Sequence, residues 1–337
     1  MKLNQVVGVV AKEEAVYGTA EVLSNTDDGC LPYLGDGDLA PPEPVQYVFG
    51  GDIGRAPATL APQKRAAPNG LFRSFVFRAL PRGRGSAYSG SNTPPNEIHR
   101  FLKAAGYDAT YSASPTPQWL YTPSAAGPGT GLTVLSYAQG SVYQHAGVLA
   151  DFGWESRGLG VPIWSFDCRG IVEIPEDDAL PTITYPQHAI LPPVAAGVVV
   201  TIGDFLTATL KGSTLKRQRS IDNPNIAQNL AGGHAGFVPG ASRPVLTLII
   251  AQTAEVASPY HTADGLYPEA LRAAATSIPV SIQFGSVQYF RHKYSMANAQ
   301  LIDVRPGNDG QVATWELDFA PHPSTPSAND FDSILFN

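Results

Sequence analysis

Charged residues are scarce in this chain. Of its 337 residues only 15% are charged, and the net charge is −7, whereas an average soluble domain has about 25% charged residues. Proteins that bind nucleic acid tightly do so with clustered lysine and arginine, so the negative net charge argues against a nucleic-acid-binding protein of that kind. Interface cores are depleted in charge. We therefore expect contacts between subunits to cover much of the surface.

Cysteine and long apolar runs are also nearly absent. The two cysteines, Cys30 and Cys168, lie far apart and belong to no Cys-x-x-Cys or Cys/His pattern, which argues against a disulfide framework and a zinc site. No window of 18 uncharged apolar residues occurs, so no membrane span is predicted. The first residues lack the apolar core of a signal peptide. We expect folding in a reducing cytoplasm and no membrane partner.

Catalytic motifs are missing as well. The glycine-rich residues 82–86 do not join a strand to a helix, as a phosphate-binding loop does, and are better read as a loop. The acidic residues 176–178 are adjacent in a proline-bounded segment, so solvated charge is favoured over a glycosidase pair. In residues 303–310, Arg305 and Pro306 occupy ligand positions of a calcium loop, which favours a turn. The seven histidines are scattered. We predict no enzyme, and no catalytic, cofactor-binding or metal-binding residues.

Glycine, proline and apolar residues are abundant. The chain has 33 glycines and 30 prolines, and 43% of its residues are apolar. Short strands joined by many turns fit this composition, so a mainly β fold is predicted. The tail, residues 324–337, ends in Ile334, Leu335 and Phe336, and is expected to dock as a final strand or on a neighbour.

The same order of elements occurs twice in the sequence. An apolar strand, a loop, a helical stretch, paired strands and a Trp-x-apolar-Asp strand follow one another in each half. The matched segments are residues 75–78 and 246–249, 102–105 and 271–274, 140–143 and 285–289, and 164–167 and 315–318. Chance similarity among short β-rich segments is the alternative. Self-similarity at long spacing favours internal duplication.

The boundaries follow from this repeat. We predict a first module over residues 1–180, a linker over 181–197, and a second module with a C-terminal tail over 198–337. One helix is expected in each module, at about residues 96–105 and 268–276, with Asn96 as the N-cap of the first. Two long loops, residues 24–69 and 80–95, belong to the first module. Loops of this length are usually functional.

Several phrases of the chain resemble one known family. They are residues 12–20 (KEEAVYGTA), 102–107 (LKAAGY), 119–124 (WLYTPS), 135–140 (LSYAQG), 172–181 (VEIPEDDALP) and 307–309 (GND). In their order and spacing they resemble the major tail tube proteins of long-tailed, non-contractile bacteriophages. The loops at 24–70 and 80–95 look longer than is usual in that family, and residues 198–245 match none of its phrases.

The resemblance implies a fold and a role. The fold is two tandem β-sandwich or partial-barrel modules, each with one flanking α-helix. The role is a structural virion protein whose rings stack into a tube that conducts double-stranded DNA without binding it specifically. Its implied partners are further copies of itself, the tape measure protein and the tail-end proteins, after assembly in the host cytoplasm. Two modules per chain favour rings of three chains.

Two other functions fit the same sequence features. A tube of a secretion or gene-transfer machine would need the same self-assembling β modules. A virion carbohydrate-binding or depolymerising protein could also be built on β-sandwiches. Rings or tubes with a pore would separate the tube proteins from the third class.

Side-chain alternation along a strand selects candidate residues for these roles. Trp164 and Phe166 fall on one face of their strand, as Trp315 and Leu317 do on theirs, and these faces are predicted to be core. The opposite faces carry three candidates for a tube lumen, which are Asp167, Glu316 and Asp318. Outer surface or a contact with a neighbour is the alternative for these carboxylates. The candidates for assembly contacts are the charged residues of the long loops, namely Asp36, Asp38, Arg82 and Arg84.

Overall fold

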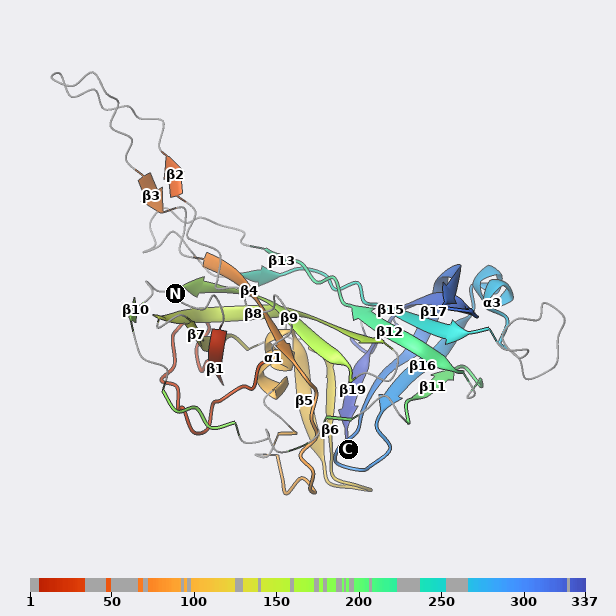
Figure 1. The fold of residues 1–337 in the computed structure, drawn as a ribbon, viewed down its shortest axis with the longest axis horizontal. Helices are drawn as coiled ribbons and strands as arrows, with labels where there is room; N and C mark the ends of the chain where they lie inside the picture. The colour runs from red at the N-terminus through yellow and green to blue at the C-terminus, as the bar shows by residue number, and fades with distance from the viewer. Residues whose placement is uncertain are drawn as a thin grey trace, which may run out of the picture.

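The fold is known from a computed structural model, drawn in Figure 1. The structure describes residues 6–33, 47–49, 66–68, 72–91, 94–95, 98–124, 130–138, 141–157, 161–172, 176–177, 181–185, 190, 192–193, 197–205, 208–222, 237–252, 266–325 and 328–337. Strands dominate this part of the chain, so the predicted mainly β class is confirmed. Its helices are α1 (Ile98–Ala104) and α3 (Pro268–Ala274).

The first half of the chain forms an antiparallel run of five strands. In spatial order they are β1 (Val6–Glu13), β7 (Leu132–Ala138), β8 (Ser141–Arg157), β9 (Ile163–Val172) and β4 (Phe72–Ala79). The short β10 (Glu176–Asp177) pairs with the start of β8. The long β8 is therefore the centre of this half, with neighbours on both of its edges.

The second half repeats that order of pairing. Its run is β11 (Val199–Ile202), β16 (Ser277–Phe284), β17 (His292–Asp309), β18 (Val312–Pro321) and β15 (Val245–Ala251). The register also agrees. Phe75 lies opposite Cys168 in the first half. Leu246, which matches Phe75 in the sequence repeat, lies opposite Phe319 in the second.

Two further strands join the halves into one sheet. β12 (Leu210–Lys216) pairs with both β8 and β15. β19 (Ser333–Phe336) pairs with β17 and with β6 (Gln118–Pro123), whose other neighbour is β5 (Tyr107–Ser112). The tail thus docks as a final strand within its own chain. Separate two-stranded sheets are formed by β13 (Ile221–Asp222) with β14 (Val238–Pro239), and by β2 (Tyr47–Phe49) with β3 (Ala66–Pro68).

One sequence match fails in the structure. Residues 140–143 and 285–289 were both expected to open a strand, and β8 does begin at Ser141. Residues 285–289 instead lie in the turn between β16 and β17. Gly285 has φ +82° and Tyr289 has φ +65°. These left-handed backbone angles are incompatible with an extended strand, so β17 begins only at His292.

The two helices lie near the predicted positions but differ in burial. In α1, Ile98, Phe101 and Leu102 are fully buried, as expected for apolar residues spaced along one helix face. Gly106, with φ +83°, follows its end. In α3, the one buried residue is Pro268. The expected N-cap of the first helix, Asn96, lies outside the described residues.

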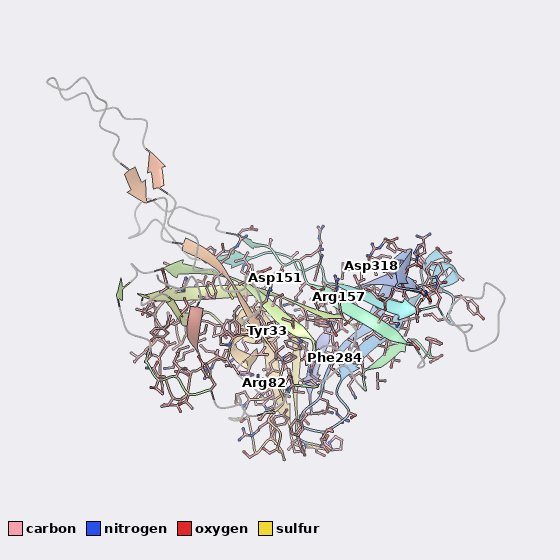
Figure 2. All side chains as sticks on the ribbon, viewed as in Figure 1. Tyr33, Arg82, Asp151, Arg157, Phe284 and Asp318 are labelled. Carbon is pink, nitrogen blue, oxygen red and sulfur yellow. The ribbon has the colours of Figure 1, made fainter. Side chains whose placement is uncertain are left out.

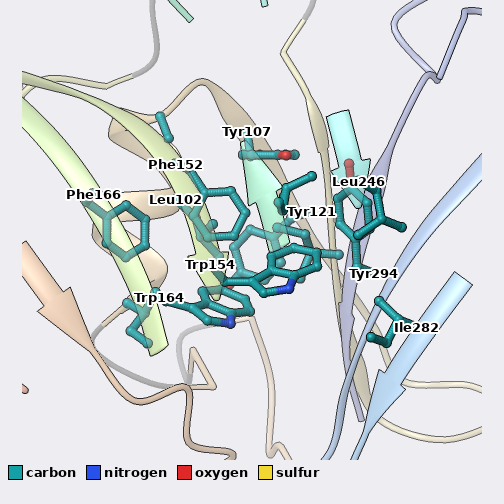
Figure 3. Packing of buried hydrophobic residues seen from close by; sticks show 14 of the residues in the cluster. Leu102, Tyr107, Tyr121, Phe152, Trp154, Trp164, Phe166, Leu246, Ile282 and Tyr294 are labelled. Atoms are coloured by element: carbon teal, nitrogen blue, oxygen red, sulfur yellow. The ribbon is translucent and has the colours of Figure 1, made fainter. Parts of the chain in front are cut away.

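A single apolar core runs through both halves. In Figure 3, Trp154 of the first half lies between Trp164 of the same half and Tyr294 of the second half. The ring centroids of Trp154 and Tyr294 are 4.8 Å apart, and Phe336 from the tail packs on Trp164 at 5.9 Å. The two predicted modules therefore share a core. In the predicted linker, Thr184 N–H donates to Asn25 O (2.8 Å), which holds this segment against the first half.

The buried His292 makes folding stability depend on pH. Its ring stacks on Phe284 at 5.0 Å and meets Trp164 edge-on at 5.1 Å. Burial lowers the pKa of His292 from 6.5 to about 3. Between pH 6.5 and about 3, the unfolded chain therefore binds a proton at His292, whereas the folded chain does not. The free energy of unfolding is therefore not reduced by this histidine above pH 6.5, and it decreases as the pH falls from 6.5 toward 3.

We expect the substitution His292→Phe to reduce this pH dependence. One such histidine contributes about 1.4 kcal/mol of unfolding free energy per pH unit below 6.5. Urea unfolding at several pH values between 6.5 and 5 measures the slope for the natural chain and the variant. A variant slope smaller by the equivalent of one proton is the expected result. An unchanged slope would show that His292 is protonated in the folded chain.

Candidate functional surface

Seven strands form a continuous sheet across the molecule, in the order β4-β9-β8-β12-β15-β18-β17. β12 is the central connection: Thr214 lies opposite Glu155 of β8 on one side and Thr247 of β15 on the other. Because side chains alternate along each strand, the whole sheet has one apolar and one polar face.

The apolar face contains the predicted core residues. Trp164, Phe166 and Leu317 are buried with at most 1% of their surface exposed, and Trp315 is partly buried against the same core. The neighbouring strands contribute Trp154, Leu215, Leu246 and Leu248. These residues lie on the same side of the pleat in paired positions, so both halves and β12 present a common apolar side.

The polar face contains the three predicted lumen candidates. Asp167 is exposed on β9 and lies opposite Asp151 of β8. Glu316 and Asp318 lie on β18, the strand of the second half that corresponds to β9. In the sequence match of residues 164–167 with 315–318, Asp318 takes the position of Asp167. In Figure 2, Asp151, Arg157 and Asp318 lie along the same long side of the body. The structure thus brings the candidates of both halves onto one surface.

The carboxylates on this face are interleaved with cations. Arg305 reaches Asp318 Oδ2 with Nη2 (3.0 Å) and Glu316 Oε2 with Nε (3.3 Å). Thr247 Oγ1 also donates to Asp318 Oδ1 (2.6 Å). Arg157 pairs with Glu155 at 2.7 Å. The face is therefore a mixed-charge surface, in which arginines lie beside the three lumen candidates or their neighbours.

Asp167 shows the same balance in its pKa. Partial burial raises the pKa of Asp167, while the neighbouring guanidinium groups of Arg78 and Arg169 lower it. Arg169 in turn donates from Nη1 to Ile221 O (2.6 Å). This contact ties the β13–β14 pair to one end of the polar face, where Leu149 and Phe237 form a small apolar cluster.

The assembly-loop candidates have different outcomes. Asp36 and Asp38 lie outside the described residues. Arg82 and Arg84 belong to a segment that packs against the second half of its own chain. Gly85 N–H donates to Tyr289 O (3.1 Å), and a Cβ at Gly83 would lie 1.9 Å from the same oxygen. This close packing differs from a loop that stays free until assembly, so a role for Arg82 and Arg84 between subunits stays a prediction.

Sequence reasoning missed a buried polar network between the halves. The hydroxyls of Tyr107 and Tyr294 both donate to Asp332 Oδ2, at 2.8 and 3.0 Å. The guanidinium of Arg217 lies 4.1 Å from the centre of the Tyr107 ring and donates to Ala105 O at the end of α1. The network connects the first half, the second half and the tail.

The pKa shifts in this network reflect burial and mutual contact. Burial raises the pKa of Asp332, and Arg217 opposes this shift. Burial alone would lower the pKa of Arg217, but Tyr107 and Asp332 raise it overall. The only sequence signal was an aspartate, Asp332, two residues before the apolar end of the tail, and Asp330 lies close to it in the sequence.

The described residues offer no metal centre and no helix of transmembrane type. No group of three or more His, Cys, Asp or Glu side chains is placed to hold a metal ion in that part of the chain. No helix there is both long and apolar enough to cross a bilayer. No protein-family model matches the chain, and no curated protein matches it either.

Proposed function

We propose that this protein is a structural subunit that assembles into stacked rings and forms a tail tube of the type found in long-tailed, non-contractile bacteriophages. In this role it acts through shape and contact and performs no catalysis. Its partners are further copies of itself, the tape measure protein and the tail-end proteins. The tube lies in the virion tail after assembly in the host cytoplasm, and DNA is ejected through its lumen.

The observation that carries this proposal is the seven-strand sheet. Both halves contribute to it with the same strand order and register, and β12 connects them edge to edge. A closed ring requires modules that join edge to edge. Head-to-tail contacts between unlike edges close into a ring when the rotation from one subunit to the next divides a full turn evenly. We interpret the halves as duplicated modules. Three chains then give a ring with six similar positions.

The polar face of the sheet is assigned to the lumen. Asp167, Glu316 and Asp318 lie on it together with arginines that offset their charge. A basic lumen would bind the phosphate backbone strongly. Closely spaced charges of both signs leave little net field, so DNA can pass without adhering.

The third class of function has less support. Sugar-binding sites commonly use exposed aromatic rings as stacking platforms. Among the residues whose burial the structure describes, Tyr17 is the aromatic side chain that is exposed, to 38%. A tube of a secretion or gene-transfer machine shares all the features above, and the genes next to this one would distinguish it from a phage tube.

Negative-stain electron microscopy of the purified protein tests the proposal. With increasing protein concentration, rings or tubes with a central pore are expected. A protein that stays monomeric at all concentrations and releases sugars from a polysaccharide would contradict it.

A further inference from the structure

The tail strand β19 is held in the sheet as a separate short piece of chain. It has four residues and lies between β17 and β6 (Figure 1). Residues 322–331 connect it to the end of β18, and those of them that the structure describes are exposed or half-buried. β17 also pairs with β16 and β18, and β6 also pairs with β5. Because these pairings do not involve β19, the strand can leave its place while the rest of the sheet stays folded.

Both ends of the tail strand are held by polar contacts. Asp332, the residue before it, accepts hydrogen bonds from two buried tyrosine hydroxyls. At the other end, Asn337 accepts hydrogen bonds from Tyr289 N–H (2.7 Å) and from Arg291 Nε (2.7 Å). Between these ends, Phe336 is fully buried. Residues 332–337 therefore form a strap with a polar contact at each end and an apolar centre.

Phe336 of the strap packs on two rings whose nitrogen atoms are buried. It lies opposite His292 in the register, and its ring centroid is 5.8 Å from that of His292 and 5.9 Å from that of Trp164. His292 Nε2 and Trp164 Nε1 are buried, and neither has a hydrogen-bond partner within the described part of the chain. Such groups destabilise the closed arrangement, because they have lost their hydrogen bonds to water. Release of the strap lets water reach this pair of rings.

We propose that residues 332–337 form an acid-released strap, which leaves the sheet when His292 is protonated while both halves stay folded. The closed state does not accommodate the added proton, because the rings packed against His292 are those of Trp164, Phe284 and Phe336, and none of them carries a charge. This device is a property of the single chain and goes beyond the proposed role in a tube.

The direction of the pH effect follows from the burial of His292. Burial is the sole cause that lowers its pKa from 6.5 to about 3, and the neighbouring cations Arg291 and Lys293 do not contribute. Once the strap opens, the pKa returns toward 6.5. The closed state is therefore fully favoured above pH 6.5 and loses stability as the pH falls toward 3. One proton bound with these two pKa values raises the ratio of open to closed chains by up to about 30-fold between pH 7.5 and pH 5.

Two other titratable groups near the strap do not produce this effect. Burial raises the pKa of Asp332, and Arg217 opposes that shift. A raised carboxyl pKa means that acid favours the docked strap, so Asp332 acts in the opposite direction. Burial also lowers the pKa of His99 to about 3. However, His99 lies on α1 and shares a hydrogen bond with the hydroxyl of Tyr121 on β6 (2.6 Å), a contact that does not involve β19.

Hydrogen exchange at residues 333–336, measured between pH 7.5 and pH 5, tests the strap. Protection is expressed relative to an unfolded peptide at the same pH, so the pH dependence of exchange itself cancels. The test variant is His292→Gln, which cannot take up the proton, and His292→Phe replaces it if glutamine prevents folding. The matched control is His322→Gln, because His322 is exposed on the connecting segment. Residues 315–319 of β18 report on the rest of the sheet.

We expect the protection of residues 333–336 to fall by up to about 30-fold at pH 5 in the natural chain and in His322→Gln, and to stay nearly constant in His292→Gln. The protection of residues 315–319 should change far less. Constant protection of the tail in the natural chain would overturn the strap, and so would an equal loss in His292→Gln. A parallel loss at residues 315–319 would show that the whole sheet opens, which also overturns it.

Discussion

Tubes built from chains with Glu155→Lys and Asp167→Lys should retain DNA. Both carboxylates lie on the polar face and are exposed. The net charge of each chain rises by four units relative to the natural one, and the two new lysines face the proposed lumen next to Arg157 and Arg169. Phosphates should then bind in a salt-dependent manner, with affinity falling by orders of magnitude between low and moderate salt. DNA ejection from particles carrying the variant should be slowed or arrested.

A neutral pair controls for the loss of carboxylates alone. Glu155→Gln with Asp167→Asn removes the acids without adding cations, and we expect ejection close to that of the natural protein. Asp318 is left unchanged because it is held by Arg305 and Thr247, and a lysine there would also disturb the sheet. Normal ejection and no salt-dependent DNA binding in the lysine variant would contradict the assignment of the polar face to the lumen.

Arg217→Met should lose about 3–5 kcal/mol of unfolding free energy. Arg217 is 3% exposed, and its removal leaves Asp332 buried without its cation. The tail strand β19 follows directly after Asp332, so its docking on β17 and β6 should weaken first. Urea unfolding measures the loss, and hydrogen exchange in residues 333–336 shows where it begins.

The double variant Arg217→Met with Asp332→Asn tests the cause. It leaves neither Arg217 nor Asp332 as a buried charge in this network, and the asparagine oxygen can still accept hydrogen bonds from the hydroxyls of Tyr107 and Tyr294. We expect it to recover most of the lost stability, since replacing both members of a buried ion pair is far less costly than removing one. Equal losses in the single and double variants would mean that Arg217 acts through packing rather than charge.

Local patterns were sufficient for some of the strands and their faces. The alternation in residues 164–168 predicted which side of β9 is buried, because a pleated strand has a strict period of two. A helix was likewise predicted at about residues 96–105, and α1 spans Ile98–Ala104. Such patterns act over a few residues and need no knowledge of the neighbouring strand.

Features that depend on distant partners could not be predicted in this way. β12 lies in a stretch with no recognisable phrase, and its partner in β8 is more than fifty residues away, since Thr214 faces Glu155. The charge balance of the polar face depends on Arg305 lying opposite Glu316, which only the register decides. Residues 285–289 resemble a strand in composition, yet two left-handed residues make them a turn.

A cryo-electron microscopy reconstruction of the assembled protein tests the central claim most directly. The account predicts rings of three chains, each ring with three times the chain mass of 35.7 kDa. It further predicts Asp167 and Asp318 on the inner wall of the tube. Rings of six chains, or a reconstruction with both carboxylates on the outer wall, would contradict it.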